Sequence, residues 1–419
     1  MNREVEVHAD LDGHTHLVGR LWARSNKGRQ SASFEYDASW LDSTARFSID
    51  SFLDLGRGAF HTPPGRLLFG TFSDAAPDRW GRKLMQRLER KQAGQEGRTI
   101  RALCEIDFLL MVDDEARLGA LRFREPGSRT FLASGGNRIP PLVFLPKLLA
   151  ASDHVIADNE SDEELKLLLA PGSSLGGARP KAAVRAPDGR LLIAKFPQAD
   201  DEWRVESWSY VALELARKAG ITTPPCQLVE VDGRSVLLVT RFDRRNQVRI
   251  PFLSAMTMLS AADGEPHSYL EIADALRQQG ASLEHDHREL WQRILFNVLV
   301  SNLDDHLRNH GFLYDTVQRG WRLSPVYDLN PIPPDVKPPY LTTRIDEQNA
   351  DTSFPLVVST GEYYGLSSED LRRITRKTVK AVSTWRAVAA DSNIPPREIE
   401  RMAGAFEHVA LQEARAYGG

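Results

Sequence analysis

A long apolar helix that ends directly in a polar loop is the feature that most constrains this chain. In LWQRILFNVLVSN, residues 290–302, large apolar side chains recur every three or four positions, the spacing of a buried helical face; they are Leu290, Ile294, Leu295, Val298 and Leu299. The next residues, LDDHLRN (303–309), are rich in charged and amide side chains. The sequence therefore predicts a core helix that carries a polar loop at its carboxyl end.

The polar loop has the spacing of a phosphoryl-transfer site. Asp304 precedes Asn309 by five residues, so the carboxylate can take the proton of an acceptor hydroxyl while the amide oxygen reaches a magnesium ion. Two strand-like runs follow, GFLYD and WRLS, and then Asp328, where a second ligand is expected because magnesium prefers hard oxygen ligands. A single Asp/Asn pair at this spacing is more often a loop or a helix cap. Asp305, four residues from Asn309, is a rival for the role of base.

Two upstream features come in the order that a protein-kinase-like phosphotransferase requires. A glycine-rich loop, residues 172–178, lies between a predicted helix and a predicted strand and has no Walker-type Gly-Lys-Ser/Thr. Lys195 ends the apolar run LLIAKF. Taken alone, the glycines indicate a turn and the lysine indicates a solvent-facing strand edge. The order of glycine loop, strand, lysine, helix, strand, helical region and Asp/Asn loop favours the kinase plan.

Five segments together resemble the HipA family of serine/threonine kinases: GSSLGGARPKAAV, LLIAKFP, LLVTRFDRR, ILFNVLVSNLDDHLRNHGFLYD and LSPVYDLNP. The resemblance covers most of residues 165–330, and VGRLW, FEYDASWL and DAAPDRWGR extend it more weakly into the N-terminal region. It implies that Asp304 is the catalytic base and that Asn309 and Asp328 bind magnesium. It also implies an ATP site made by the glycine loop, a phosphate-pairing lysine, a hinge strand and a loop histidine: Ser174, Leu175, Gly176, Gly177, Ala178, Lys195, Val239, Thr240, Arg241, Phe242 and His306.

The resemblance also implies a self-silencing step at the glycine loop. Ser174 would be phosphorylated by a sister molecule, and Ser173 is the alternative site. A phosphoserine carries about −1.5 to −2 charges at neutral pH, so it would repel the nucleotide. It could pair instead with Arg179 or Lys181. The other interpretation is that the two serines only give the loop small side chains.

Several charged residues have two open interpretations. Glu206 is either the partner of Lys195 or a solvated residue off the apolar stripe of its helix. The basic run 241–249 either contacts nucleotide or a partner, or is a solvated hinge segment. Four histidines show no zinc-type spacing; His306 is expected to brace the loop, and the other three are expected on the surface or in loops: His285, His287 and His310.

The patterns predict an α+β, two-lobed protein-kinase-like fold, with a β-rich N-terminal lobe and subdomain and an all-helical C-terminal lobe. We expect a subdomain at 1–140, the part of the N lobe with the glycine loop and the lysine at 141–247, and the catalytic lobe at 248–419. In the first part, VEVHADLDG and HLVGRLWA indicate strands joined at Asp12-Gly13, and SASFEYDASWL continues their alternation. Helices are expected in DAAPDRWGRKLMQRLERK, after a capping box at Ser161, and in VESWSYVALELARKAG, and a hairpin in PKAAVRAPDGRLLIAKF.

Composition narrows the partners and the location. The chain has 419 residues, a net charge of −4 and two cysteines, which together predict a reducing, cytoplasmic setting without nucleic acid as the main direct partner. No apolar run is long enough to span a membrane. By resemblance the cofactors are ATP and Mg²⁺, the target is a translation protein such as an aminoacyl-tRNA synthetase, and the partner is a small helix-turn-helix antitoxin that reaches DNA for the pair. A small-molecule or lipid phosphotransferase and a non-catalytic pseudokinase are the alternatives.

Overall fold

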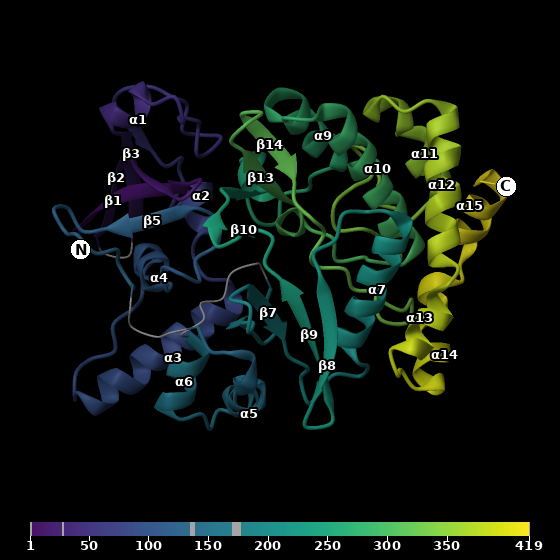
Figure 1. Ribbon diagram of the computed structural model, residues 1–419, viewed down its shortest axis with the longest axis horizontal. Coiled ribbons are helices and arrows are strands. Elements are labelled where there is room, and N and C mark those ends of the chain that lie inside the picture. The colour runs from purple at the N-terminus through teal and green to yellow at the C-terminus, as the bar shows by residue number, and fades with distance from the viewer. Residues whose placement is uncertain (1, 27–28, 135–138, 170–176, 419) are drawn as a thin grey trace. The chain divides into compact units, whose positions relative to one another are not determined.

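The computed structural model describes residues 2–26, 29–134, 139–169 and 177–418 (Figure 1). The chain divides into two compact units. Unit 1 comprises Met1–Ala199 with Thr240–Leu253, and unit 2 comprises Asp200–Val239 with Ser254–Gly419. The three-part division expected at residues 140 and 247 stays a prediction.

An antiparallel sheet organises the N-terminal part of unit 1, in the order β4-β3-β2-β1-β5. Its strands are β1 (Asn2–Leu11), β2 (His14–Asn26), β3 (Arg29–Tyr36), β4 (Ala59–His61) and β5 (Leu121–Arg124). The predicted turn at Asp12-Gly13 is confirmed, and both residues have positive φ, 51° and 81°. The strand expected through SASFEYDASWL ends earlier, because Asp37 accepts a hydrogen bond from Ser39 N at 2.9 Å and caps α1 (Ala38–Asp42).

Helices and a hairpin complete unit 1. The helices are η1 (Leu142–Phe144), α2 (Gly70–Asp74), α3 (Arg79–Gln95), α4 (Glu105–Met111), α5 (Leu145–Ile156) and α6 (Asp162–Leu169). The capping box before α6 is confirmed: Glu164 N donates to Ser161 Oγ at 3.2 Å and Ser161 N donates to Glu164 Oε2 at 2.7 Å. The expected hairpin is also present, as β6 (Lys181–Arg185) and β7 (Leu191–Lys195), and a second small one joins β10 (Arg244–Arg245) to β11 (Val248–Arg249).

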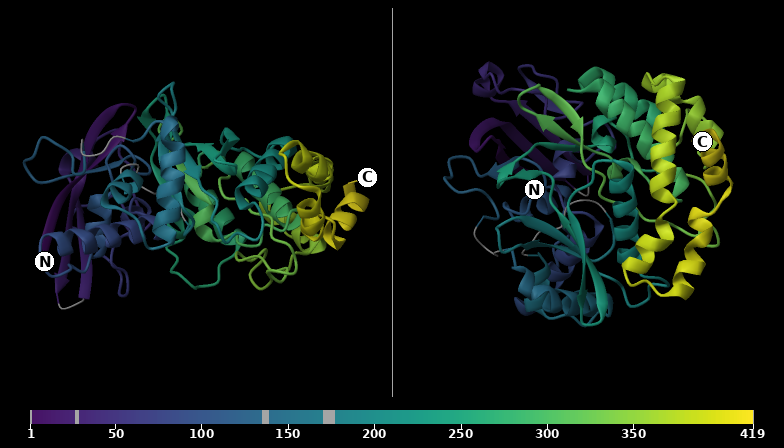
Figure 2. Two further views of the ribbon diagram at one scale, coloured as in Figure 1. Left: turned by 90° about the horizontal axis from the view of Figure 1, so that it is seen from below. Right: turned by 45° about the vertical axis from the view of Figure 1, so that its right-hand side comes forward.

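Unit 2 is mainly helical. It begins with α7 (Val205–Ala219), which ends at Gly220 in the left-handed region as predicted (φ 83°), and with the paired strands β8 (Cys226–Val231) and β9 (Arg234–Thr240). After the short strand β12 (Phe252–Ser254) come the remaining helices: α8 (Ala255–Met258), α9 (Tyr269–Gln279), α10 (Leu283–Leu299), η2 (Leu307–Asn309), α11 (Phe354–Ser359), η3 (Gly361–Tyr364), α12 (Ser368–Val382), α13 (Trp385–Asp391), α14 (Pro396–Phe406) and α15 (Val409–Gly418). Figure 2 shows α12 beside α15.

A second hairpin, after β8–β9, interrupts the helices of unit 2. The runs GFLYD and WRLS form β13 (Gly311–Asp315) and β14 (Gly320–Leu323), as their patterns predicted. The preceding helix α10 is buried along almost its whole length, and Leu290, Ile294 and Leu295 are fully covered. The predicted core helix is therefore confirmed, and it delivers the polar loop. Within the described ranges, no helix is long and apolar enough to cross a membrane.

Candidate active site

Asn302 fixes the start of the polar loop. The residue before it, Ser301, has a positive φ of 51°, which turns the chain away from α10. The Asn302 side chain is buried; its Nδ2 donates to Asn297 Oδ1 at 3.0 Å, and its Oδ1 accepts from Asn330 N at 2.8 Å. One buried amide thus joins the loop to the segment that contains Asp328. The two residues that form this hydrogen bond, Asn302 and Asn330, are 28 positions apart in the sequence.

Asp304 and Asp305 lie next to each other but have opposite surroundings. The Asp305 carboxylate is buried, and its Oδ2 accepts from Asn297 Nδ2 at 2.7 Å and from the Tyr269 hydroxyl and lies 2.8 Å from His310 Nε2. The side chain of Asp304 is 66% exposed. A general base must reach the proton that it accepts. Burial therefore favours Asp304 over its rival, and Asp305 holds the loop.

The buried tyrosine beside Asp305 contributes an uncharged hydroxyl. Burial, together with the Asp305 carboxylate, raises the pKa of Tyr269 well above its ordinary value. The ring of Tyr269 also meets the ring of His310 edge to face, with centroids 5.5 Å apart. The hydroxyl therefore stays a hydrogen-bond donor to Asp305 across the whole neutral range.

The two predicted magnesium ligands lie at one pocket. Asn309 and Asp328 both line a small pocket in unit 2. The Asn309 amide nitrogen donates to Asp304 O at 3.1 Å, so the amide oxygen is the atom that could bind a metal, and Asp328 Oδ1 accepts from Asn330 Nδ2 at 3.0 Å. Among the residues that the structure describes, no group of three or more His, Cys, Asp or Glu is arranged to hold a metal ion. One carboxylate and one amide oxygen fit magnesium, which takes its other ligands from water and nucleotide phosphates.

The histidines differ in part from expectation. His285, with a side chain 58% exposed, lies on the surface as predicted. His287 is buried instead, because it lies on the inner side of α10, where its Nε2 is 2.9 Å from Ala273 O. His306 was expected to brace the loop, but the ring that contacts Asp305 is that of His310. The backbone N of His306 donates to Asp304 O at 3.0 Å.

The predicted nucleotide residues of unit 1 are described only in part. Ser174, Leu175 and Gly176, with the alternative phosphosite Ser173, lie outside the described residues. Gly177 has a φ of 104°, a conformation that favours glycine, and a Cβ there would come within 2.9 Å of Lys181 Nζ. Lys195 ends β7 and is half-buried. Of the predicted hinge residues, Val239 and Thr240 end β9 and Arg241 and Phe242 follow it. Val239, which belongs to unit 2, is buried, and Phe242 packs on Phe252, with ring centroids 6.2 Å apart. Their roles, with those of Thr240 and Ala178, stay predictions.

Glu206 and Lys181, two charged residues considered in the sequence analysis, are both buried. Glu206 on α7 is only 3% exposed, so its interpretation as a solvated residue was wrong. Lys181 is also buried and pairs with Asp78 Oδ2 at 2.8 Å, while Asp78 Oδ1 caps α3 through Gly81 N at 2.9 Å. The lysine that was expected to be available to a phosphoserine already has a buried carboxylate partner.

The two ends of the basic run 241–249 belong to a buried network in unit 1, so its interpretation as a solvated hinge was wrong for these residues and holds only for the exposed residues 245–247. Asp243 is fully buried; its Oδ2 lies 2.6 Å from Arg241 Nη2 and 2.6 Å from Arg244 Nη1, and accepts from Gly119 N at 2.8 Å. The two guanidinium groups also donate to Arg117 O, at 3.0 and 2.7 Å. Burial opposes the charge of Asp243, but the adjacent arginines hold its pKa well below the ordinary value.

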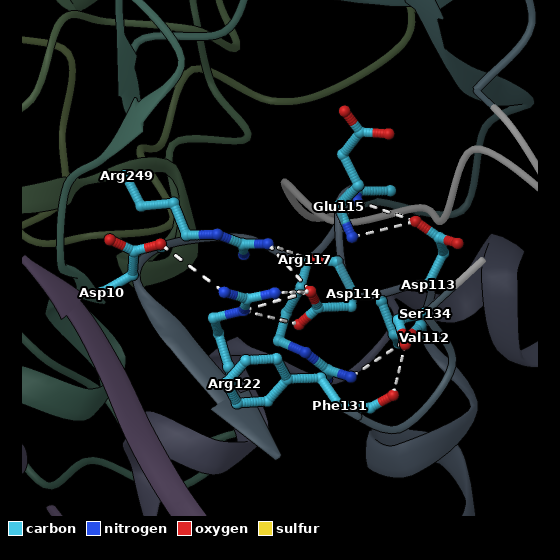
Figure 3. Close-up of polar contacts among 12 residues, drawn as sticks. Asp10, Val112, Asp113, Asp114, Glu115, Arg117, Arg122, Phe131, Ser134 and Arg249 are labelled. Carbon is cyan, nitrogen blue, oxygen red and sulfur yellow. Dashed lines mark hydrogen bonds and ion pairs between the residues drawn. The ribbon is translucent and has the colours of Figure 1, made fainter. Parts of the chain in front are cut away.

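A neighbouring part of the network surrounds Asp114 (Figure 3). Arg122 Nη2 lies 2.5 Å from Asp114 Oδ2, and Arg249 Nη2 donates to Asp114 O at 2.6 Å. Arg117 is fully buried and donates to backbone carbonyls, including Val112 O at 2.8 Å; burial lowers its pKa to about 9. The sequence showed the arginines but gave no sign that many of their acceptors are backbone carbonyls of residues 109–119.

Comparison with known proteins identifies two family regions in the chain. The model of the HipA-like C-terminal domain matches residues 173–386, and the model of the HipA N-terminal domain matches residues 10–107. A similar fold is found in the solved Shewanella oneidensis MR-1 toxin–antitoxin complex of HipA, HipB and operator DNA, with a TM-score of 0.61 and 15% sequence identity over 98% of this chain and 99% of that chain. This likeness confirms the predicted fold class, but the C-terminal lobe is not all-helical as expected, because it also contains the three-stranded sheet β12-β13-β14.

Two curated relatives carry names that assign them provisionally to the kinases. Y4mE from Sinorhizobium fredii is 29% identical over 178 residues, which is 37% of this chain and 41% of that protein. A Haemophilus influenzae protein is 25% identical over 224 residues, 46% of this chain and 64% of that protein. The matches thus span less than two thirds of the length of either relative.

Proposed function

Because the chain belongs to the HipA family, we propose that it is an ATP-dependent protein kinase that acts on serine or threonine hydroxyls. The observation that carries the proposal is the contrast within the loop. Asp304 is exposed, Asp305 is buried and held by three neighbours, and Asn309 and Asp328 line one pocket. A carboxylate open to an acceptor beside two oxygen ligands is what phosphoryl transfer needs.

The proposed reaction assigns one role to each of these residues. Asp304 accepts the proton of the acceptor hydroxyl while the hydroxyl oxygen bonds to the γ-phosphorus of ATP; the bond from that phosphorus to the β–γ bridging oxygen breaks, and ADP leaves. Asn309 and Asp328 would hold Mg²⁺ through their side-chain oxygens. When bound, this ion neutralises charge on the β- and γ-phosphates. Lys195, Gly177, Ala178 and the hinge residues 239–242 would bind the nucleotide.

The finer parts of the proposal concern regulation and partners. The target class is a protein of the translation machinery, such as an aminoacyl-tRNA synthetase, in the cytoplasm. Ser174 is the proposed site of autophosphorylation. A small helix-turn-helix antitoxin is the proposed partner, and DNA is reached through it; the complex of Shewanella oneidensis HipA with HipB and operator DNA supports this assembly by analogy.

Phosphosite mass spectrometry tests the proposal. The purified chain and its Asp304→Asn variant are each incubated with Mg²⁺–ATP and a cell lysate depleted of endogenous kinase activity. We expect new phosphoserine or phosphothreonine sites on lysate proteins, and on Ser174 of the chain, with the wild type only. Equal thermal unfolding of both chains shows that the variant is folded. Labelling that appears in the metabolite or lipid fraction and not in the protein fraction would contradict the proposed acceptor class.

A further inference from the structure

The proline-rich segment 330–340 lies along the polar loop. Prolines prevent this stretch from being helical throughout. Its backbone is attached at both ends: Ile332 N donates to Ser301 O at 3.0 Å, and Thr342 N, just beyond it, donates to Leu303 O at 3.1 Å. Thr343 Oγ1 donates to Asp305 O at 2.6 Å. The segment and the loop are thus joined on either side of Asp304.

Lys337 extends from this segment to the proposed base. Its Nζ lies 3.4 Å from Asp304 Oδ1, 3.2 Å from Leu303 O and 3.4 Å from Thr342 Oγ1. An ammonium group has three N–H donors, and each has an acceptor here. The ammonium group is therefore directed at the loop, and its contact with Asp304 is a route by which the lysine can affect the reaction.

We propose that Lys337 is a positioning residue for Asp304, an inference that rests on the proposed kinase function. An exposed carboxylate on a loop can adopt several rotamers, and a base is effective only in the one that faces the acceptor proton. The ammonium group, with the Thr342 hydroxyl 3.5 Å from the same oxygen, restrains Asp304 Oδ1 and leaves Oδ2 for the proton. Pro338 and Pro339 follow Lys337 and limit its backbone freedom.

A contribution to stability alone is the competing explanation for this contact. The two side chains of the pair are 36% and 66% exposed. Ion pairs with this exposure contribute little to folding, because solvent screens the charges. Loss of the lysine should therefore change catalysis far more than it changes unfolding.

Steady-state kinetics of three variants test the inference. Lys337→Met keeps much of the length of the side chain without the charge, Lys337→Arg keeps the charge, and Lys380→Met on the exposed side of α12 is the matched control. We expect Lys337→Met to lower kcat about 10- to 100-fold, the scale of a small misplacement of a catalytic group, while KM for ATP and the unfolding midpoint stay close to wild type. Lys337→Arg should recover most of kcat, and Lys380→Met should match the wild type.

The outcomes separate this inference from the proposed function. Wild-type kcat in Lys337→Met, or a loss accompanied by an equal rise in KM for ATP or by a lower unfolding midpoint, would overturn the positioning role while the kinase function stands. A Lys337→Arg variant as slow as Lys337→Met would overturn it too. A wild-type chain that transfers no phosphoryl group to any acceptor would overturn the proposed function and the role of Lys337 together.

Discussion

Aspartates have opposite surroundings in the polar loop of unit 2 and in the arginine network of unit 1. In the network, the carboxylate of Asp243 is fully buried, and arginines and a backbone N–H meet its oxygens. In the loop, most of the Asp304 side chain is exposed to solvent. Its Oδ1 atom lies near Lys337 and Thr342. An aspartate whose oxygens are all occupied by buried partners is structural. One that is restrained on one side and open on the other can accept a proton.

The same contrast occurs inside the loop itself. Asp305 resembles Asp243, since it is buried and held by several donors, although it directly follows Asp304. The position of a carboxylate in the sequence therefore says less about its role than its burial and its partners. The following predictions test this difference, beginning with the largest expected effect.

Asp304→Asn and Asp305→Asn should fail in different ways. Loss of a positioned general base typically costs about 10²–10⁴-fold in rate, so Asp304→Asn should lose most phosphoryl transfer while it unfolds like the wild type. Asp305→Asn should lower the free energy of unfolding by about 1–3 kcal/mol, because a buried acceptor of charged character is replaced by a weaker one. Single-turnover kinetics and thermal unfolding decide. A folded, inactive Asp305→Asn beside a nearly wild-type Asp304→Asn would reverse the assignment.

Asp243→Ala should destabilise unit 1 strongly. Removal of one member of a buried ion pair typically costs about 3–5 kcal/mol, because the other charge stays buried without its partner. The adjacent arginines depress the pKa of Asp243, so its stabilising effect is complete above the unfolded-state value of about 4 and is lost only as the pH falls through the lower folded-state value. Urea unfolding at neutral pH measures the loss, and a change below about 1 kcal/mol would contradict the structural role.

Asp328→Ala should weaken the binding of Mg²⁺–ATP. The nucleotide phosphates would lose the carboxylate that holds their metal, and we expect at least about a tenfold loss of affinity, which is about 1.4 kcal/mol. Isothermal titration with ATP in magnesium, and again in EDTA, separates the metal-dependent part. Equal affinity of the wild type and the variant in magnesium would remove Asp328 from the proposed metal site.

Arg308→Ala should have the smallest effect and provides the comparison for Asp243. Arg308 pairs with Asp263, but the two side chains are 42% and 70% exposed. Exposed pairs typically contribute about 0–1 kcal/mol to folding. Urea unfolding should therefore show a change of less than about 1 kcal/mol. A loss as large as that of Asp243→Ala would mean that burial does not explain the difference between the two regions.

Local patterns predicted those elements whose signals lie within one stretch of sequence. The apolar spacing of α10 and α7, the Asp12-Gly13 turn and the Ser161 capping box each depend on residues a few positions apart. The loop motif was found for the same reason, because the five-residue spacing of Asp304 and Asn309 is local. The strand β3 was predicted too long, since the alternating pattern continues through SASFEYDASWL although Asp37 starts a helix there.

The parts that sequence reasoning missed depend on partners far along the chain. Arg241 donates to the carbonyl of Arg117, 124 residues away, so its burial could not be inferred from the basic run that contains it. Lys337 lies 33 residues from Asp304, in a segment whose prolines predicted only the absence of a helix. For Glu206 the sequence left two interpretations open, and its burial is seen only in the fold, where α7 has buried residues beyond its apolar stripe.

The hairpin β13–β14 offers a place for protein engineering. Its base is fixed, because Ser324 N donates to Gly311 O at 2.8 Å, and Asn302 joins the segments on either side of it. Its tip is held only locally: Asp315 Oδ1 accepts from Val317 N and Gln318 N at 2.9 and 2.8 Å, and Val317 is 88% exposed. An epitope tag or a fluorescent reporter inserted at Val317 would therefore lengthen the turn without moving Asp304 relative to Asp328 in space. A labelled chain of this kind would allow binding to be followed in living cells.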